Sequence, residues 1–413
     1  MADAHDEPAG REEPSVPTGE PSDGEAPTDS SELHVDRRTV LRNAAGAGYA
    51  LGVAHVLGVD DYLTASGGTV TVDAALVRPD PDDPSTVERR TREVPARWHA
   101  AVSAALEVHA RLTRLSIPGY VNSAVVPGSY DDGSARISIG FRDGDMRSLP
   151  SDLAGLLPRI DLDWDGSFDD VSLQVEGVDA LDHFETDLDE DAEPHLVPYP
   201  NIDPVPGGVR CETRDSYATV TPALYHPEAD EPTFATALHA YAGDSAIGAP
   251  LRLPANRTTS RPEIGYVTDE LPDADVAVAR STDEFTPGSE LDVVDPIPVA
   301  GQYTLWGLAD LIARGEYVEK MGGTTGRTQG RIHGVDAATC VTADSCRRGQ
   351  LRWGTEADMS DGDSGSVTYH PDPDLADGAL IASINSARTW WPGQDHVWGI
   401  AAHALTDEHG YHF

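Results

Sequence analysis

Positive charge is scarce in this chain of 413 residues, which carries 29 lysines and arginines against 71 aspartates and glutamates. Lys320 is the only lysine, so arginine supplies the rest of the positive charge. The formal net charge of -42 repels phosphate backbones and anionic lipids, which argues against nucleic acid or a membrane surface as a partner. A net charge of this size is tolerated in concentrated salt, because the screening length falls to roughly 3 Å near 1 M and the acidic side chains no longer repel one another strongly. We therefore expect a protein adapted to high salt.

Cysteine is equally scarce, and three residues are too few for a cysteine-rich scaffold. Cys340 and Cys346 bracket a short loop that a local disulfide could close, worth roughly 2–3 kcal/mol. Two small buried thiols are the alternative for this pair. Cys211 has no evident partner. No second cysteine or histidine pair stands at ligand spacing, so we expect no zinc site. We also expect no cofactor, and calcium is the one metal that stays open as an alternative.

The first 66 residues contain no apolar run long enough for a confident membrane helix. Residues 1–35 are rich in Asp, Glu, Pro, Gly and Ser and are expected to form a disordered acidic leader. Within residues 36–66, Arg37 and Arg38 precede a weakly apolar run over 43–59, which resembles a twin-arginine export signal. Export would place the protein outside the cell or on its surface. The alternative is an ordinary buried helix in a cytoplasmic protein.

Residues 68–185 are predicted to form a small α+β unit, followed by an acidic, proline-rich linker over 186–208. Apolar residues three or four apart predict a helix over 96–115. Alternating stretches predict strands over 120–126, 136–141 and 171–175. Asp161, Asp163 and Asp165 have the opening spacing of a calcium loop, but Ser172 stands where the bidentate glutamate belongs. We favour a solvated acidic loop over 161–170 and leave calcium as the alternative.

From residue 209 to 413 the chain changes to short apolar runs separated by turn residues. Ten to twelve strands with few helical patterns predict one all-β sandwich or barrel domain. The runs that we expect as strands are 217–225, 233–242, 263–267, 275–279, 302–305, 330–335, 350–353, 366–369, 379–384 and 397–401.

The strongest chemical signal is Asp361-Gly-Asp-Ser-Gly-Ser366. Glycines on both sides allow a tight loop to present the hydroxyl of Ser364, and the backbone N–H groups of Gly362 and Ser364 could face a developing oxyanion. An ordinary polar turn is the alternative.

A nucleophilic serine needs a general base, and the base needs a group that orients it. His239 ends an apolar run and Asp275 opens another, in the order His, Asp, Ser at separations of 36 and 89 residues. Taken alone, His239 could be an ordinary core histidine and Asp275 an ordinary turn aspartate.

Four ordered motifs within residues 210–413 resemble the chymotrypsin/trypsin-like serine protease superfamily, and most closely its streptogrisin-like bacterial branch. The histidine motif is Thr236-Ala-Leu-His239, the aspartate motif is Asp275-Val-Ala-Val278, and Gly362-Asp-Ser-Gly365 surrounds the serine. Between them, Met321-Gly-Gly-Thr-Thr-Gly-Arg-Thr-Gln-Gly-Arg-Ile332 is similar to a strand–turn–strand of that branch.

The resemblance implies a mainly β fold, with a C-terminal double β-barrel of chymotrypsin type and the site in the cleft between barrels. His239 would be the general base, Asp275 the orienting carboxylate and Ser364 the nucleophile. The N–H groups of Gly362 and Ser364 would form the oxyanion hole, and Asp363 would support the loop by pairing with an internal cation or polar group. Residues 68–200 would be a pro-region that inhibits the site or assists folding.

The predicted function is that of a serine endopeptidase acting on a peptide or protein substrate through an acyl-enzyme. Counting back from Ser364 places Asp358 where trypsin-like enzymes carry the acid that selects Arg or Lys. One alternative is a catalytically silent protease-fold protein that binds peptides or mediates surface interactions. The other is a serine esterase that uses the same site, since both reactions pass through an acyl-enzyme.

Overall fold

The computed structural model of the chain describes residues 68–80, 86–115, 117–142, 171–178 and 202–413, with short gaps after residue 202 at 215, 230, 244, 255–260, 293, 343–344, 373–377 and 392–393. The predicted leader at 1–35, the export signal at 36–66 and the loop at 161–170 lie outside these residues. Within the described part of the chain, no helix is both long and apolar enough to span a membrane.

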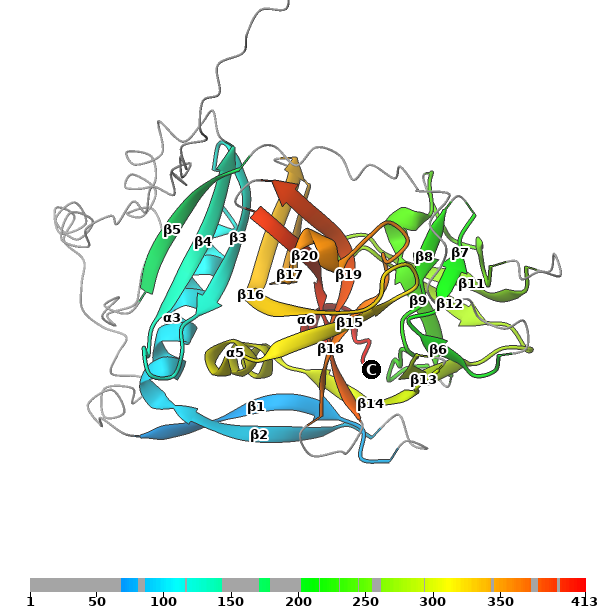
Figure 1. Cartoon of the computed structure of the whole chain (residues 1–413), viewed down its shortest axis with the longest axis horizontal. Coiled ribbons are helices and arrows are strands. Elements are labelled where there is room, and N and C mark those ends of the chain that lie inside the picture. The colour runs from blue at the N-terminus through cyan, green and yellow to red at the C-terminus, as the bar shows by residue number, and fades with distance from the viewer. Residues whose placement is uncertain are drawn as a thin grey trace, which may run out of the picture. The chain divides into compact units, whose positions relative to one another are not determined.

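The first of two barrels is a sheet of six antiparallel strands in the order β8-β7-β10-β11-β12-β9 (Figure 1). A backbone hydrogen bond from Thr221 N to Ala235 O, 2.9 Å long, brings the chain that follows β8 beside β9 and curls the sheet. The strands are β7 (Arg210–Glu212), β8 (Tyr217–Thr219), β9 (Thr233–Ala237), β10 (Pro250–Arg252), β11 (Glu263–Leu271) and β12 (Val276–Ser281).

The second barrel is a closed ring of six strands, in which each strand pairs antiparallel with two neighbours. The ring runs β15-β16-β17-β20-β19-β18 and returns to β15. Its strands are β15 (Tyr317–Gly322), β16 (Gly326–Thr342), β17 (Ser345–Trp353), β18 (Val367–Pro371), β19 (Ala379–Trp391) and β20 (Gln394–Ala401). Closure leaves no unpaired edge within the ring. The predicted mainly β fold with a C-terminal double barrel is thereby confirmed.

Strands from the N-terminal segment extend the second sheet. β1 pairs antiparallel with β14, and β3 pairs antiparallel with β16. The segment is therefore hydrogen-bonded into the barrel sheet, and its limits as a domain, like the linker over 186–208, stay a prediction. Its elements are β1 (Thr69–Val77), β2 (Glu88–Pro95), α3 (Ala96–Leu112), β3 (Tyr120–Pro127), β4 (Ala135–Arg142) and β5 (Val171–Val178). Three further strands are β6 (Val205–Gly207), β13 (Pro287–Leu291) and β14 (Ile297–Tyr303).

Two helices in the C-terminal half were not predicted, α5 (Leu305–Arg314) and α6 (Ala402–His409). The sequence does mark α5. Thr304 caps its first turn by accepting a hydrogen bond from Gly307 N at 3.2 Å, and Gly315 ends it with a φ of 70°. The apolar residues between these caps follow the helical period. We expected a strand over 302–305, and that strand ends at Tyr303, one residue before the cap.

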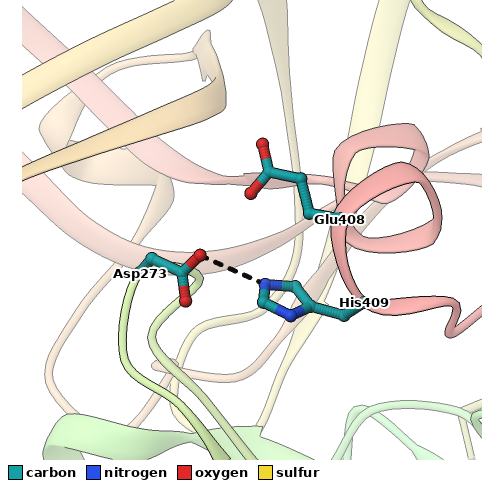
Figure 2. A group of neighbouring side chains, drawn as sticks. All are labelled: Asp273, Glu408 and His409. Carbon is teal, nitrogen blue, oxygen red and sulfur yellow. Dashed lines mark ion pairs between the residues drawn. The ribbon is translucent and has the colours of Figure 1, made fainter.

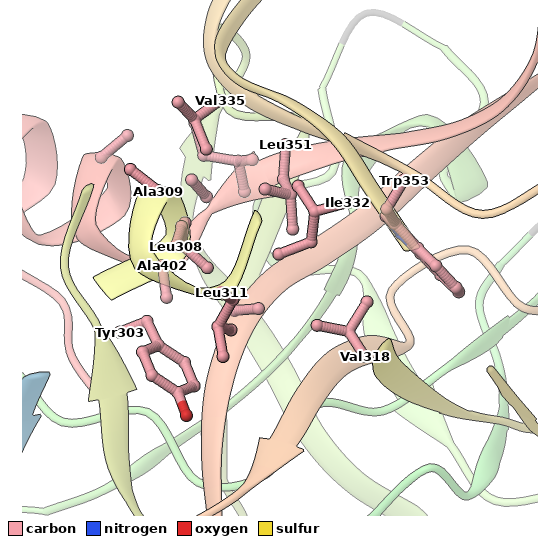
Figure 3. Packing of buried hydrophobic residues seen from close by; sticks show 14 of the residues in the cluster. Tyr303, Leu308, Ala309, Leu311, Val318, Ile332, Val335, Leu351, Trp353 and Ala402 are labelled. Carbon is pink, nitrogen blue, oxygen red and sulfur yellow. The ribbon is translucent and has the colours of Figure 1, made fainter. Parts of the chain in front are cut away.

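The core of the second barrel is built by side chains from α5, the barrel strands and α6 (Figure 3). Leu308 and Leu311 of α5 are fully buried and pack in one cluster with Val318, Leu351 and Trp353. Full burial of such a side chain contributes about 1.5–3 kcal/mol. α5 therefore packs against the second barrel, where β16 is among its neighbours.

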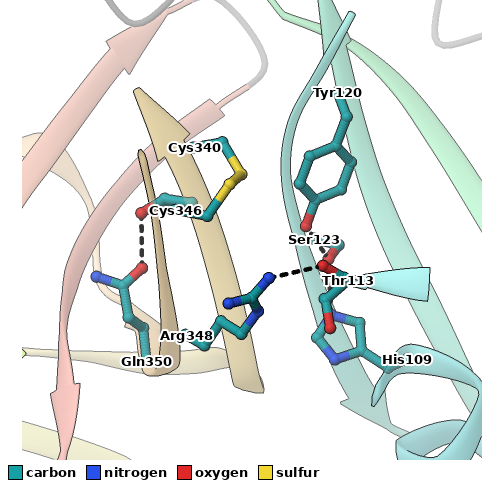
Figure 4. Close-up of a disulfide and its surroundings, with 9 residues drawn as sticks. His109, Thr113, Tyr120, Ser123, Cys340, Cys346, Arg348 and Gln350 are labelled. Carbon is teal, nitrogen blue, oxygen red and sulfur yellow. Dashed lines mark hydrogen bonds between the residues drawn. A yellow bond between two sulfur atoms is a disulfide. The ribbon is translucent and has the colours of Figure 1, made fainter. Parts of the chain in front are cut away.

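Cys340 and Cys346 form a disulfide across the β16–β17 hairpin (Figure 4). The local bridge weighed from the sequence is confirmed. Cys211 is a free thiol buried in the first barrel, and burial raises its pKa to about 12.

Replacing Cys340 and Cys346 together by serine should lower the free energy of unfolding by roughly 2 kcal/mol, because a short loop is no longer closed in the unfolded chain. Denaturant titration in molar salt measures this difference. Reductant should destabilise the native protein by the same amount and leave the double variant unchanged. Equal stabilities of the native protein and the variant would contradict the prediction.

Candidate active site

Strand pairing brings His239 and Asp275 together although 36 residues separate them. β9 and β12 are antiparallel neighbours, and Ala237 at the end of β9 lies opposite Val276 at the start of β12. The chain leaves β9 in a short 3-10 turn, η4 (Leu238–Ala240), which carries His239. A backbone hydrogen bond from Leu238 N to Asp275 O, 3.0 Å long, fixes the turn against the residue before β12.

Asp275 holds the imidazole of His239 by two contacts. Its Oδ2 lies 2.6 Å from His239 Nδ1, and its Oδ1 accepts a hydrogen bond from His239 N at 3.0 Å. The carboxylate is buried, and its backbone has a φ of 58°, in the left-handed region that aspartate tolerates better than most residues. Burial alone would raise the pKa of Asp275, but the nearby positive charges of His239 and Arg347 and the hydrogen bonds from His239 lower it overall.

Ser364 completes the chain of hydrogen bonds, with its Oγ 2.9 Å from His239 Nε2. It lies in the loop that leads into β18, and Thr219 N of the first barrel donates to Ser364 O at 2.8 Å. Gly365 N donates to Asn385 O of β19 at 2.8 Å. The loop is thus tied to both barrels, and the distance that the mechanism requires is met.

The two glycines of the serine loop have positive φ angles, 86° at Gly362 and 88° at Gly365. A Cβ on Gly365 would approach Thr219 O to 2.3 Å, so only glycine fits. Among the residues that the structure describes, no acceptor takes the N–H of Gly362 or Ser364. Two neighbouring donors beside a serine hydroxyl are the arrangement that an oxyanion requires.

Asp363 is fully buried beneath the serine loop and contacts the only lysine of the chain. Lys320 Nζ lies 2.9 Å from Asp363 Oδ2, and neither side chain is exposed. Oδ1 accepts hydrogen bonds from Thr324 N and Thr325 N at 2.8 and 3.1 Å. Burial lowers the pKa of Lys320, and the charge of Asp363 opposes that shift. This network ties the serine loop to the turn between β15 and β16.

Asp358 lies in a short 3-10 turn, η5 (Glu356–Asp358), and its carboxylate closes a capping box. Its Oδ2 accepts hydrogen bonds from Thr355 N at 2.8 Å and from Thr355 Oγ1 at 2.9 Å. The side chain is therefore committed to its own turn. Its suggested role in selecting Arg or Lys stays a prediction.

The only group of potential metal ligands in the described residues is Asp273, Glu408 and His409 (Figure 2). Their ligand atoms lie within 4.8 Å of one another, and both carboxylates are exposed. His409 Nε2 lies 3.4 Å from Asp273 Oδ2, so an ion pair already connects the end of α6 to the loop before Asp275. Exposed acidic groups gather in this way without an ion, and we assign no metal here.

Sequence reasoning did not identify two partners in the site, Arg347 beside Asp275 and Lys320 as the internal cation expected beside Asp363. Arg347 Nη1 lies 3.0 Å from Asp275 Oδ2. The two residues are 72 positions apart in the sequence, and no local motif predicts their contact. The pairing of Lys320 with Asp363 had a weak signal, because a single lysine in an arginine-rich set of cations is an unusual residue. The motifs at His239, Asp275 and Ser364 were informative because a family resemblance covers them.

No protein-family model matches the sequence, and no curated protein matches it. Among solved structures, a glutamic acid specific serine protease is 18% identical, over 50% of this chain and 99% of that one, with a TM-score of 0.38. Thermobifida fusca protease A is 18% identical, over 50% and 97%, with a TM-score of 0.37. Cellulomonas bogoriensis chymotrypsin is 18% identical, over 50% and 96%, with a TM-score of 0.35.

Proposed function

We propose that the chain is a serine endopeptidase of the chymotrypsin type, in which Ser364 forms an acyl-enzyme with the substrate. The observation that carries this proposal is the hydrogen-bonded chain from Asp275 Oδ2 to His239 Nδ1 and from His239 Nε2 to Ser364 Oγ, at 2.6 and 2.9 Å. This arrangement supports the roles that the motif order predicts for the three groups. A buried carboxylate orients a histidine, and the histidine faces a serine hydroxyl.

In the proposed mechanism, Ser364 Oγ attacks the scissile carbonyl while His239 Nε2 takes its proton. The carbonyl oxygen becomes negative and is stabilised by the N–H groups of Gly362 and Ser364. The C–N bond then breaks as His239 returns the proton to the leaving amine. Water, deprotonated by the same histidine, hydrolyses the acyl-enzyme and restores Ser364. Asp275 stays ionised throughout and stabilises the imidazolium.

The geometry favours an enzyme over a silent binding protein. A peptide-binding module gains nothing from aligning a buried aspartate, a histidine and a serine at hydrogen-bond distances, together with two unpaired N–H groups. An esterase would use the same groups, so the choice between amide and ester rests on the resemblance to proteases. We propose a peptide or protein as the substrate, and export together with high salt as its setting.

We also propose that residues 68–185 act in cis as a folding aid. β1 and β3 hydrogen-bond to β14 and β16, so the N-terminal segment adds strands to the barrel sheet. Strand pairing of this kind stabilises the second barrel, which carries the serine loop. The alternative role for this segment is that of an inhibitor of the site.

The test is labelling with a fluorophosphonate probe in molar salt, which modifies only an activated serine. The native protein should be labelled stoichiometrically, whereas Ser364→Ala and His239→Ala should not be labelled. Ser245→Ala removes an exposed serine whose hydroxyl contacts Glu270 and no residue of the triad, so this matched control should label like the native protein. A peptide substrate and a p-nitrophenyl ester then separate peptidase from esterase. A folded native protein that takes no label would favour the silent binding protein.

A further inference from the structure

We propose that Arg347 is a positioning residue of the triad, which weakens the hold of Asp275 on the protonated His239 and so keeps the enzyme active at lower pH. This inference rests on the proposed function and concerns the regulation of the same site. Arg347 touches neither the substrate nor the reacting atoms, and acts through Asp275.

The guanidinium and the imidazole share one carboxylate oxygen. Arg347 Nη1 lies 3.0 Å from Asp275 Oδ2, and His239 Nδ1 lies 2.6 Å from the same atom. The side chain of Asp275 is 2% exposed and that of Arg347 is 22% exposed. Both contacts are therefore partly shielded from water, where charges interact more strongly than on an open surface.

A permanent cation on this oxygen changes the balance between the two forms of His239. Protonated imidazole is stabilised by the negative charge of Asp275, and the guanidinium of Arg347 offsets part of that charge. Arginine keeps its own charge across the whole working pH range. Removing the guanidinium should therefore strengthen the interaction of Asp275 with protonated His239. The same contact keeps Asp275 ionised in its buried position.

The other groups that contact Asp275 carry no permanent positive charge. η4 contributes only His239, through its ring and its backbone N, and Leu238 N, which donates to the backbone carbonyl. Asp273, on the same loop, is exposed and faces His409 of α6. Arg347 is the cation, besides His239, whose charge acts on the carboxylate of Asp275.

The residues on either side of Arg347 make contacts of their own, away from the triad. Cys346 precedes it and is bound to Cys340 across the hairpin. Arg348 follows it and donates to Thr113 O, the carbonyl at the C-cap of α3, at 2.9 Å (Figure 4). Successive side chains of a strand point to opposite faces. Arg348 therefore faces the N-terminal segment while Arg347 faces the triad.

The experiment measures the second-order rate constant of fluorophosphonate labelling from pH 5 to 9 in molar salt, on the full chain. In Arg347→Gln the acid limb of the profile should move up by about one pH unit. On the acid side of the native limb, the rate should therefore fall about tenfold relative to the native protein, with a similar plateau at high pH. Arg347→Lys should lie between the two. Arg348→Gln, the matched control one residue away, should follow the native profile.

A purely structural role would lower the plateau and leave the acid limb where it is, and that result would overturn the proposal. An Arg347→Gln profile identical to the native one would overturn it as well. If the native protein takes no label at all, the proposed function has failed, and the next measurement decides the inference independently.

That measurement needs no variant that could misfold and no catalysis. Nitrogen-15 NMR of arginine side chains in the native protein should show one guanidinium signal that shifts with the same midpoint as the ring of His239, because both groups share Asp275 Oδ2. Absence of any arginine signal that follows the histidine would overturn the proposal.

Discussion

Replacing Asp275 by asparagine is expected to lower kcat on a peptide substrate by about 10⁴, with the fold retained. The carboxylate holds His239 through both oxygens, at 2.6 Å to Nδ1 and 3.0 Å to the backbone N. An amide of the same shape favours the wrong tautomer of the imidazole and no longer stabilises the imidazolium. Steady-state kinetics in molar salt, with circular dichroism to confirm folding, measure the loss.

Asp273→Asn is the matched control for this prediction. Asp273 lies two residues earlier in the same loop, is exposed, and pairs with His409 (Figure 2). It carries the same charge without contacting His239, so this variant should keep kcat within about twofold of the native value, as expected for an exposed pair. A loss of equal size in both variants would indicate that general loop charge matters more than the contact with the histidine.

The second large effect is expected for Lys320→Met, which should lower the free energy of unfolding by about 3–5 kcal/mol. The variant leaves the fully buried Asp363 without the cation that lies 2.9 Å from it. The cost arises from an uncompensated buried charge, which exceeds the net value of the pair itself. Because Asp363 also accepts hydrogen bonds from the β15–β16 turn, labelling of Ser364 should be lost as the loop shifts.

Two further variants test whether the buried, unpaired charge of Asp363 causes the loss of stability. The double variant Lys320→Met with Asp363→Asn removes both charges and should recover much of the lost stability, while Lys320→Met alone should not. Arg327→Met breaks an exposed ion pair with Glu319 and should cost at most about 1 kcal/mol. Denaturant titration of all four proteins gives the comparison. Equal losses for Lys320→Met and Arg327→Met would contradict the role of burial.

Much of the fold was predictable because it depends on local patterns. The helix over 96–115 is observed as α3 over Ala96–Leu112, since its apolar residues follow the helical period. The strands expected at 120–126 and 136–141 are β3 and β4, within a residue at each end. Short apolar runs likewise predicted many of the barrel strands, but not β7 or β10. The α5 helix was missed because its apolar run is short, and only the caps at Thr304 and Gly315 distinguish it from a strand.

The attachment of the N-terminal segment to the barrel was beyond sequence reasoning. A strand pattern shows which residues alternate between two faces, and it carries no information about the partner strand. β3 could have paired anywhere, and in the structure it pairs with β16, more than 200 residues later. β15 pairs with β16 only as far as Arg331, and β3 pairs with residues of β16 beyond that point.

What the sequence by itself determined is the chemistry that each local segment can offer. It placed a serine between two glycines, a histidine at the end of a strand and an aspartate at the start of another, and these requirements are local because they concern turn geometry and residue type. Only the tertiary structure decided which charges meet. Lys320 under Asp363 and Arg347 on Asp275 are contacts between distant segments, and burial makes them strong because water no longer screens the charges.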